Sequence, residues 1–484
     1  MNGWQEPNGG KRIYLITDNT KMDGFTDYIK PEDIEHLYVT YSESRVNLGI
    51  HYYRNSLYSS NLVGICRIKS VDDETLYDAA GNELLIKVVP RFNVTVVELL
   101  NYIRDDDEFD RYMAPQTISN RHKEKDIEAI DRNEIFYFFE NEKPLKVDGG
   151  ISSENSIITV TVFLTLLRLL CRRPLMGRML KEEENLTGKV KGKIVIEKNI
   201  RSNTMHGRND RFYCQYLRFS DDIIENQILK AALRKAKRFI VDFGDYSKDN
   251  NNYASMISYC SNALRHISDI QCSGTACNGL KFSGCYTYYK PVMAMARMVL
   301  DDISVESNGE ISTTGYIVPY AISMEKLFEV YVRAYLKKNG IESYRSKSDK
   351  GIRLEKYDNK TDVFMEEEGL SNPGKYISGS IKPDLILTDR ESGETVVFDV
   401  KYKDYTNGDS RNDRLQLLAY SMMMNANNVG IILPTHVDVE IFDARRINSM
   451  ENRIVKYHQM LLGIMKDNPT IADYIKDNTF EKKE

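Results

Sequence analysis

The sequence predicts a multidomain α/β protein, with a mixed α/β N-terminal region, a mostly helical middle region and a C-terminal mixed sheet flanked by helices. A chain of 484 residues is too long for one ordinary hydrophobic core. Apolar runs of strand length occur in its first and last thirds, whereas helical spacing of apolar residues dominates the middle. The expected domains are residues 1–150, 151–312 and 313–484, with a charged stretch at 120–132 and a polar one at 304–315 near the boundaries.

Hydrophobic periodicity and helix-capping signals predict the elements of the first two domains. In the first we expect strands at Arg12–Thr17 and Glu83–Val89 and a helix at Val94–Asp105. In the second we expect a buried helix or strand at Ile157–Leu170, a short strand at Gly192–Ile196, a helix at Ile223–Phe243 after a cap at Ser220–Asp222, and a helix at Tyr288–Asp302 that begins near Pro291. The run Ile157–Leu170 contains an arginine and is too short to span a bilayer.

The last third predicts an α/β core. We expect a helix at Ser323–Lys338, because its apolar residues recur at three- and four-residue spacing. The other expected elements are strands at Ile341–Arg345, Ile381–Thr388, Thr395–Lys403 and Val429–Leu433, and a helix at Arg414–Met424. An order of helix, three strands, helix and strand is typical of a mixed sheet covered by helices.

The bulk composition excludes several classes of protein. Hydrophobic residues at 42% and charged residues at 28% describe a globular chain rather than a fibrous or disordered one. The net charge of −5 gives no overall attraction to nucleic acid, so any DNA contact must come from local basic patches. Residues 1–12 are polar and carry no secretion signal, and seven cysteines are too few for a disulfide framework. We therefore expect a cytoplasmic protein without a membrane partner.

A polar constellation lies in the predicted core. Residues 389–394 form a polar, glycine-containing turn, which predicts a hairpin between the strands at 381–388 and 395–403. Because side chains alternate along a strand, Asp399 and Lys401 project from one face, while the other face carries only Val396, Phe398, Val400 and Tyr402. Asp384, on the partner strand, is expected to reach the same place.

Two carboxylates and a lysine on one face are suited to metal-assisted phosphodiester hydrolysis. Asp384 and Asp399 offer the hard oxygen ligands that Mg²⁺ prefers, and the backbone carbonyl of Val400 is a further possible ligand. A bound ion lowers the pKa of a coordinated water, and Lys401 can orient that water or offset negative charge. The alternative is structural, because Asp-x-Lys on a strand is common as a solvated ion pair.

The motifs around this constellation resemble the PD-(D/E)xK nuclease superfamily, in the branch with a Gln-x-x-x-Tyr helix. The resemblance is carried by Pro383-Asp384, by Asp399-Val-Lys401 and by Gln416-x-x-x-Tyr420, which share a helix face. It implies that Asp384 and Asp399 are magnesium ligands, that Lys401 is the catalytic lysine, and that Gln416 and Tyr420 support the site. An acidic residue of the first core helix often joins the metal cluster. Glu329 is the candidate here, with Glu325 as the alternative and a surface ion pair as the structural interpretation.

A narrower resemblance extends over most of the chain. Phe398–Lys403 with Arg411–Tyr420 is similar to the C-terminal signature of McrC proteins. Further similar segments are Met324–Glu329, Val190–Ile194, Asn226–Lys230 and, more loosely, Val63–Cys66 and Val88–Arg91. McrC subunits are nuclease partners of McrB, an AAA+ GTPase ring that recognises and translocates modified DNA, and their N-terminal region docks in that ring. This chain contains no G-x-x-x-x-G-K-[ST] motif, so a motor must come from another chain.

Other basic and cysteine-containing segments have two interpretations each. Lys403, Arg411 and Arg414 lie near the proposed site and are expected phosphate contacts. The basic segment Lys230–Arg238 could follow a phosphate backbone or form a solvated helix face. Three cysteines near His266 could bind zinc or an iron–sulfur cluster, but no C-x-x-C pair occurs, which favours free, mostly buried thiols; they are Cys272, Cys277 and Cys285.

The sequence therefore predicts a Mg²⁺-dependent DNA endonuclease subunit of a restriction system that acts on 5-methylcytosine-type or otherwise modified double-stranded DNA and defends against phage. Its expected partner is an McrB-like AAA+ GTPase ring. Two alternatives remain. One is a non-cutting adaptor that stimulates the partner GTPase, and the other is a stand-alone repair nuclease.

Overall fold

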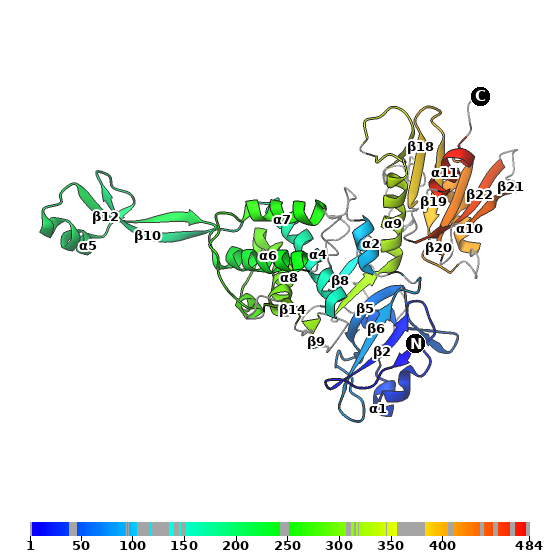
Figure 1. Ribbon diagram of the computed structural model, residues 1–484, viewed down its shortest axis with the longest axis horizontal. Helices are drawn as coiled ribbons and strands as arrows, with labels where there is room; N and C mark the ends of the chain where they lie inside the picture. Colours follow the sequence, from blue (N-terminus) through cyan, green and yellow to red (C-terminus); the bar gives the residue numbers. More distant parts are fainter. Residues whose placement is uncertain are drawn as a thin grey trace, which may run out of the picture. The chain divides into compact units, whose positions relative to one another are not determined.

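The chain divides into two compact units. The computed structural model describes residues 2–37, 46–92, 94, 96–103, 116–118, 135–139, 145–146, 152–242, 251–305, 311–313, 316–317, 319–344, 346–355, 383–404, 411–435, 440–448, 454–464 and 470–480. Unit 1 joins Met1–Glu142 with Pro319–Glu484, and unit 2 is Lys143–Val318 (Figure 1). The charged stretch at 120–132 lies outside the described residues. Among the described helices, none has the length and apolar character that a bilayer crossing requires.

The first sheet of unit 1 has seven strands and is built from both ends of the chain. In spatial order they are β1 (Gly3–Trp4), β2 (Lys11–Thr17), β6 (Glu83–Val89), β5 (Leu62–Arg67), β16 (Tyr320–Ser323), β8 (Phe136–Phe139) and β7 (Gln116–Ile118). The two strands predicted here are confirmed, and α2 (Val96–Ile103) lies within the predicted helix. Smaller elements complete this region: η1 (Phe25–Tyr28), α1 (Pro31–Ile34), η2 (Val46–Gly49), β3 (His51–Tyr53) and β4 (Ser56–Tyr58).

Strand β16 is the point where the returning chain enters this sheet. It pairs antiparallel with β5 on one side and with β8 on the other. Gly64 of β5 has a φ of +149°, and a Cβ there would lie 2.1 Å from the carbonyl oxygen of Tyr320, so the close approach requires glycine. This arrangement differs from the three consecutive domains expected from the sequence, because the last segment contributes a strand to the first sheet.

The second sheet of unit 1 has six strands and helices on both faces. Its order is β17 (Ile352–Leu354), β18 (Leu385–Asp389), β19 (Thr395–Val400), β20 (Asn428–Thr435), β22 (Ile454–Gly463) and β21 (Glu440–Asn448). β19, β20 and β22 run parallel, whereas the other neighbours are antiparallel. The predicted mixed sheet is confirmed. The expected strand at Ile341–Arg345 is wrong for the residues described, because only Glu342 forms a bridge, to Arg353 of β17.

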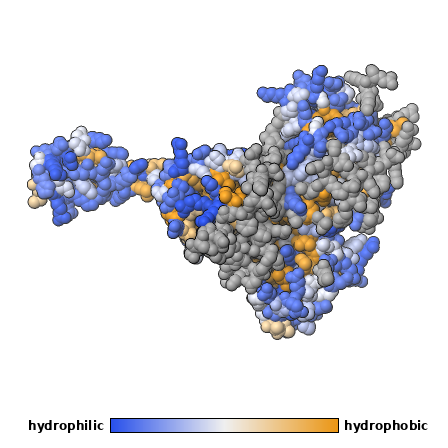
Figure 2. All heavy atoms as spheres, in the orientation of Figure 1, coloured by the Kyte–Doolittle hydropathy of each residue, from blue (hydrophilic) through white to orange (hydrophobic). Residues whose placement is uncertain are grey.

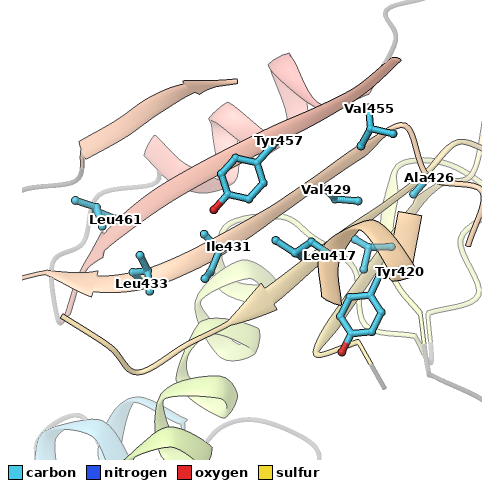
Figure 3. Packing of buried hydrophobic residues seen from close by; sticks show 10 residues of the cluster. Leu417, Tyr420, Ala426, Val429, Ile431, Leu433, Val455, Tyr457 and Leu461 are labelled. Atoms are coloured by element: carbon cyan, nitrogen blue, oxygen red, sulfur yellow. The ribbon is translucent and has the colours of Figure 1, made fainter. Parts of the chain in front are cut away.

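Helices α9 (Met324–Lys338), α10 (Arg411–Met423) and α11 (Thr470–Asn478) cover this sheet. α9 begins where predicted, because the hydroxyl of Ser323 accepts a hydrogen bond from the Lys326 amide at 3.4 Å. On the opposite face, α10 packs on β19 and β20, and the buried core there extends to β22 (Figure 3). It includes Val397, Leu417, Tyr420, Val429 and Ile431. Strand β20 is buried along its whole length, as expected of a central parallel strand.

Unit 2 consists of a helical body and a long hairpin. The body contains α4 (Ser152–Cys171), α6 (Ile224–Asp242), α7 (Asn251–Ala263) and α8 (Tyr289–Asp302), with short turns η6 (Gly274–Cys277) and η7 (Gly284–Tyr286) and small strands β9 (Leu145–Lys146), β13 (Ile303–Val305), β14 (Ile311–Thr313) and β15 (Tyr316–Ile317). The two helices predicted at 223–243 and 288–302 are confirmed as α6 and α8. The run Ile157–Leu170, predicted to be a buried helix or strand, is a helix, and residues 158–170 are mostly buried within α4.

The hairpin, called the arm below, comprises residues 178–220. Its stem pairs β10 (Arg178–Thr187) with β12 (Arg211–Ser220) over ten residues each, and its tip carries β11 (Lys193–Ile194), α5 (Ile196–Ser202) and η4 (Thr204–His206) (Figure 1). At ~3.3 Å per residue the stem is roughly 30 Å long. The strand expected at Gly192–Ile196 is confirmed only at its centre, because Ile196 begins α5.

Candidate active site

The hairpin of β18 and β19 brings the predicted acidic residues together. Its register pairs Leu385 with Phe398, which places Asp384 beside the end of β19. The backbone amide of Val400 donates a hydrogen bond to Oδ2 of Asp384 at 2.8 Å. Nζ of Lys401 lies 2.9 Å from Oδ2 of Asp399. The structure thus places Asp384, Asp399 and Lys401 in one site.

The charges in this site are strongly coupled. Burial, and then the neighbouring charge of Asp399, raise the pKa of Asp384, and the two carboxyl groups lie within hydrogen-bonding reach of each other. For Lys401, burial alone would lower the pKa. The charges of Asp399 and Asp384 together outweigh that effect and raise it. Lys401 is therefore a cation that offsets part of the negative charge of the two carboxyl groups. Without further positive charge, the carboxyl groups of Asp384 and Asp399 repel each other.

The acidic pair fits a divalent cation in one specific respect. Asp399 is 1% exposed, and its Oδ2 lies 2.9 Å from Nζ of Lys401. Because the two buried carboxyl groups repel each other, a bound divalent cation would offset the negative charge that this lysine leaves. Among the described residues, no group of three or more histidine, cysteine, aspartate or glutamate side chains is arranged around a common point. The carboxylate ligands available are therefore Asp384 and Asp399.

The residue expected to complete the metal cluster is engaged elsewhere. Glu329, on α9, is buried, and its carboxylate lies 2.6 Å from Nζ of Lys326 and 3.1 Å from Nη2 of Arg333. Nη2 of Arg333 also donates to the backbone carbonyl of Asp384 at 2.7 Å. These contacts favour a structural role for Glu329, which fixes the position of α9 beside Asp384. Glu325, the alternative, accepts a hydrogen bond from Asn61 at 2.9 Å.

Lys326 is a member of the site that the sequence did not single out. Burial would lower its pKa, but the charges of Glu329 and Asp384 and the bond to Glu329 together raise it. Its ammonium group is therefore a second cation of the site, besides Lys401, and interacts with both Glu329 and Asp384. The sequence signal was weak, because a lysine in the first turn of a helix is usually solvent-exposed.

The supporting residues on α10 are only partly as predicted. Nε2 of Gln416 donates to the hydroxyl of Tyr420 at 2.6 Å, and Tyr420 is fully buried in the core between α10 and the sheet. Lys403 forms an ion pair with the buried Asp413 at 2.7 Å, which joins the chain after β19 to α10. That contact favours a structural role over the expected DNA contact. Arg411 and Arg414 are exposed in the first turn of α10.

The basic segment and the cysteines of unit 2 have mainly structural contacts. Lys230 and Arg234 donate to the carbonyls of Ile267 and Ile270, and Lys235 donates to that of Leu300. Three of the five basic residues in Lys230–Arg238 thus hold the loop after α7 and the end of α8.

All seven cysteines are free thiols. Burial raises the pKa of Cys277 to about 12 and also raises the pKa of Cys272, which favours protonated thiols at both positions. Cys285 is exposed.

A mixed sheet with helices on both faces, and two buried carboxyl groups beside a lysine at the end of one of its hairpins, define an α/β protein with a candidate functional site. The sequence model of the family described as McrBC 5-methylcytosine restriction system component matches residues 146–434, more than half of the chain. This chain belongs to that family.

Two solved structures resemble the fold at low sequence identity. One is a chain of a half-complex from the tetradecameric assembly of Thermococcus gammatolerans McrB AAA+ hexamers with bound McrC, at 13% identity and a TM-score of 0.40, covering 97% of this chain and 100% of that one. The other is a chain of the Thermococcus gammatolerans McrBC complex, at 13% identity and a TM-score of 0.29, covering 68% of this chain and 88% of that one. No curated protein matches the sequence.

Proposed function

We propose that this protein is the Mg²⁺-dependent DNA endonuclease subunit of a modification-dependent restriction system. The observation that carries the proposal is the buried Asp399 beside Asp384 and Lys401, in a member of the McrBC family. Buried carboxylates without sufficient compensation are costly, and functional sites are where such groups are retained. A non-cutting adaptor would have no need of them.

The chemistry follows from the ligands that the chain provides. Asp384 and Asp399 would hold the cation, and the backbone carbonyl of Val400 would be a further ligand. When bound, Mg²⁺ supplies an activated water and neutralises charge on the scissile phosphate. Lys401, held against Asp399, orients the attacking water and offsets the negative charge that develops. Arg411 and Arg414 are proposed to contact the DNA backbone.

The substrate is proposed to be double-stranded DNA that carries 5-methylcytosine or a related modification, because the family description names this base. The test is cleavage of a methylated and an unmethylated plasmid by the full-length chain, with an McrB-like partner, GTP and Mg²⁺. Cutting restricted to the methylated plasmid supports the proposal. Partner stimulation without any cutting would favour the adaptor, and cutting without partner or GTP would favour a stand-alone nuclease.

The partner is proposed to be an AAA+ GTPase ring, as in the solved complexes of McrB hexamers with McrC. The resemblance to McrC placed docking in the N-terminal region, residues 1–150, but the surface that we propose for it is the arm of unit 2. Several large apolar side chains on it are 41–73% exposed, namely Met179, Leu180, Val190, Ile196, Ile200, Met205, Leu217 and Phe219. Figure 2 shows hydrophobic surface along the stem. A two-stranded ribbon that exposes this many apolar groups is marginal alone and is stabilised when a partner covers it.

A pair of matched variants tests the arm. Leu217 is 63% exposed and lies opposite Lys181 in the stem, so Leu217→Asp creates a cross-strand ion pair and leaves the ribbon intact. We expect this variant to bind the partner at least about tenfold more weakly, as for loss of an apolar interface anchor. Val241→Asp is the control, because Val241 is 62% exposed on α6 of the same unit. Equal partner affinity in both variants would remove the arm from the docking surface.

A further inference from the structure

Two residues that follow β6 contact the chain directly after Lys401. Nη2 of Arg91 donates a hydrogen bond to the backbone carbonyl of Tyr402 at 3.0 Å. The guanidinium also lies over the Tyr402 ring, 5.1 Å from its centroid. The Phe92 ring meets the Tyr402 ring edge-on at 5.2 Å. The first sheet of unit 1 therefore holds Tyr402 by its backbone and by its ring.

Asp18, at the end of β2, fixes Arg91 in turn. The backbone amide of Arg91 donates to Oδ1 of Asp18 at 2.7 Å, and Nε of Arg91 lies 3.7 Å from Oδ2. Asp18 is completely buried, and its own amide donates to the Val89 carbonyl at 3.0 Å. The Arg91 side chain is 18% exposed, so this pair is largely shielded from solvent, and a buried carboxylate is costly unless it has a partner such as this one.

These contacts reach the catalytic lysine through the backbone. Lys401 lies beyond the last residue of β19, so strand pairing alone fixes it only through its amide, which donates to the Ile432 carbonyl at 3.0 Å. The hydrogen bond from Arg91 to the carbonyl of Tyr402 holds the backbone on the C-terminal side of Lys401. On α9, the Phe328 ring completes the enclosure of Tyr402 at 5.9 Å. The orientation of the Lys401 side chain depends on this backbone geometry.

We propose that Arg91 is a positioning residue for cleavage: by holding Tyr402, it keeps Lys401 against Asp399, so the nuclease site is completed by the N-terminal sheet. This inference rests on the proposed nuclease function. It gives the segment Val88–Arg91 an effect on cleavage, although this segment supplies neither a proposed metal ligand nor the catalytic lysine.

The test compares Arg91→Ala and Arg91→Lys with Arg12→Ala in the full-length protein. Arg12 is the matched control, because it forms a buried ion pair with Asp78 at 3.0 Å in the same sheet and lies 3.8 Å from the centroid of the Tyr28 ring. We expect Arg91→Ala to lower kcat for DNA cleavage at least about tenfold with little change in KM, as for a misplaced catalytic group. Arg91→Lys, which can still donate to the carbonyl, is expected to recover part of the loss. Arg12→Ala retains kcat.

A second readout does not depend on cleavage. Reductive methylation with ¹³C gives each lysine an NMR signal, and Lys401→Arg assigns the signal of Lys401. We expect Arg91→Ala to shift that signal, and Arg12→Ala to leave it in place. Unchanged kcat in Arg91→Ala, or an unchanged Lys401 signal, overturns the proposal. If the wild type cuts no DNA, the nuclease function fails by itself, while the NMR comparison still decides whether Arg91 positions Lys401.

Discussion

At the scale of single residues, the site separates two kinds of acidic group. Asp384 and Asp399 face each other with Lys401 as their nearest cation, whereas Glu329 is neutralised by Lys326 and Arg333. Ion pairs of this kind are difficult to exchange for a metal bond, because two half-buried cations would lose their partner. The metal site is therefore expected to depend on the aspartates and not on the glutamate.

Metal titration separates these roles. We expect Glu329→Gln to bind Mn²⁺ within about threefold of the wild type, whereas Asp399→Asn loses measurable binding because a charged ligand is removed. Isothermal titration calorimetry at neutral pH measures both, with the melting temperature as a control for folding. Equal loss of affinity in the two variants would place Glu329 among the metal ligands, as its position on the first core helix suggested.

At the scale of elements, His458 joins β22 to its neighbours. Its Nε2 lies 2.9 Å from Oδ1 of Asn428 on β20, and its Nδ1 lies 3.0 Å from the hydroxyl of Tyr474 on α11. Burial, and then the charge of Lys456, lower the pKa of His458 to about 4. The imidazole is therefore neutral in the folded protein at neutral pH.

This histidine predicts an acid-sensitive core. In the unfolded chain His458 takes up a proton near pH 6.5, but in the folded chain only near pH 4, so stability is complete above about 6.5 and is lost as the pH falls. The loss is about 1.4 kcal/mol per pH unit within this window. Denaturant unfolding at pH 7.5, 6.5 and 5.5 is expected to show a shallower decline in His458→Gln. An identical decline in both proteins would assign the acid sensitivity to other groups.

The elements that the sequence predicted are those with clear local signals. The hairpin of β18 and β19 follows from alternating strands around a polar turn, and α9 follows from its cap and apolar face. Strand β22 was not predicted, because Lys456, Gln459 and Leu461 are good helix formers and pairing with β20 overrides that preference. Lys326 and Arg91 were missed for a related reason, since their importance arises from contacts with residues distant in sequence.

At the scale of the whole chain, unit 2 is an insertion into a hairpin. Strands β8 and β16 are antiparallel neighbours in the first sheet, with Phe138 opposite Tyr320, although the whole of unit 2 lies between them in sequence. Within unit 2, Leu145 pairs with Ile317, so the chain enters and leaves that unit side by side. The sequence pattern contained no sign of this return, because strand pairing across such a distance has no local signature.

The insertion predicts which truncations fold. Joining residues 142 and 319 by a short glycine–serine linker is expected to leave unit 1 folded, because Phe138 and Tyr320, on the strands before and after the insertion, already pair. Residues 319–484 alone are expected to aggregate, because α9 would lose the packing of Tyr331 on Tyr102 and β16 would lose both neighbours. Circular dichroism and cooperative thermal unfolding measure both. A stable, soluble fragment 319–484 would show that the N-terminal sheet is dispensable for the core.

The most direct test of a metal-dependent cleavage site in this chain is the activity of Asp399→Asn. The measurement is plasmid cleavage with Mg²⁺, GTP and the partner ring, together with the rate of GTP hydrolysis by that ring. We expect Asp399→Asn to lose at least about 10³-fold of the cleavage rate, as for removal of an essential metal ligand, while GTPase stimulation persists. Glu391→Gln, an exposed turn residue of the same hairpin, is the control and is expected to cut normally. Cleavage by Asp399→Asn at the wild-type rate would contradict the assignment of this site.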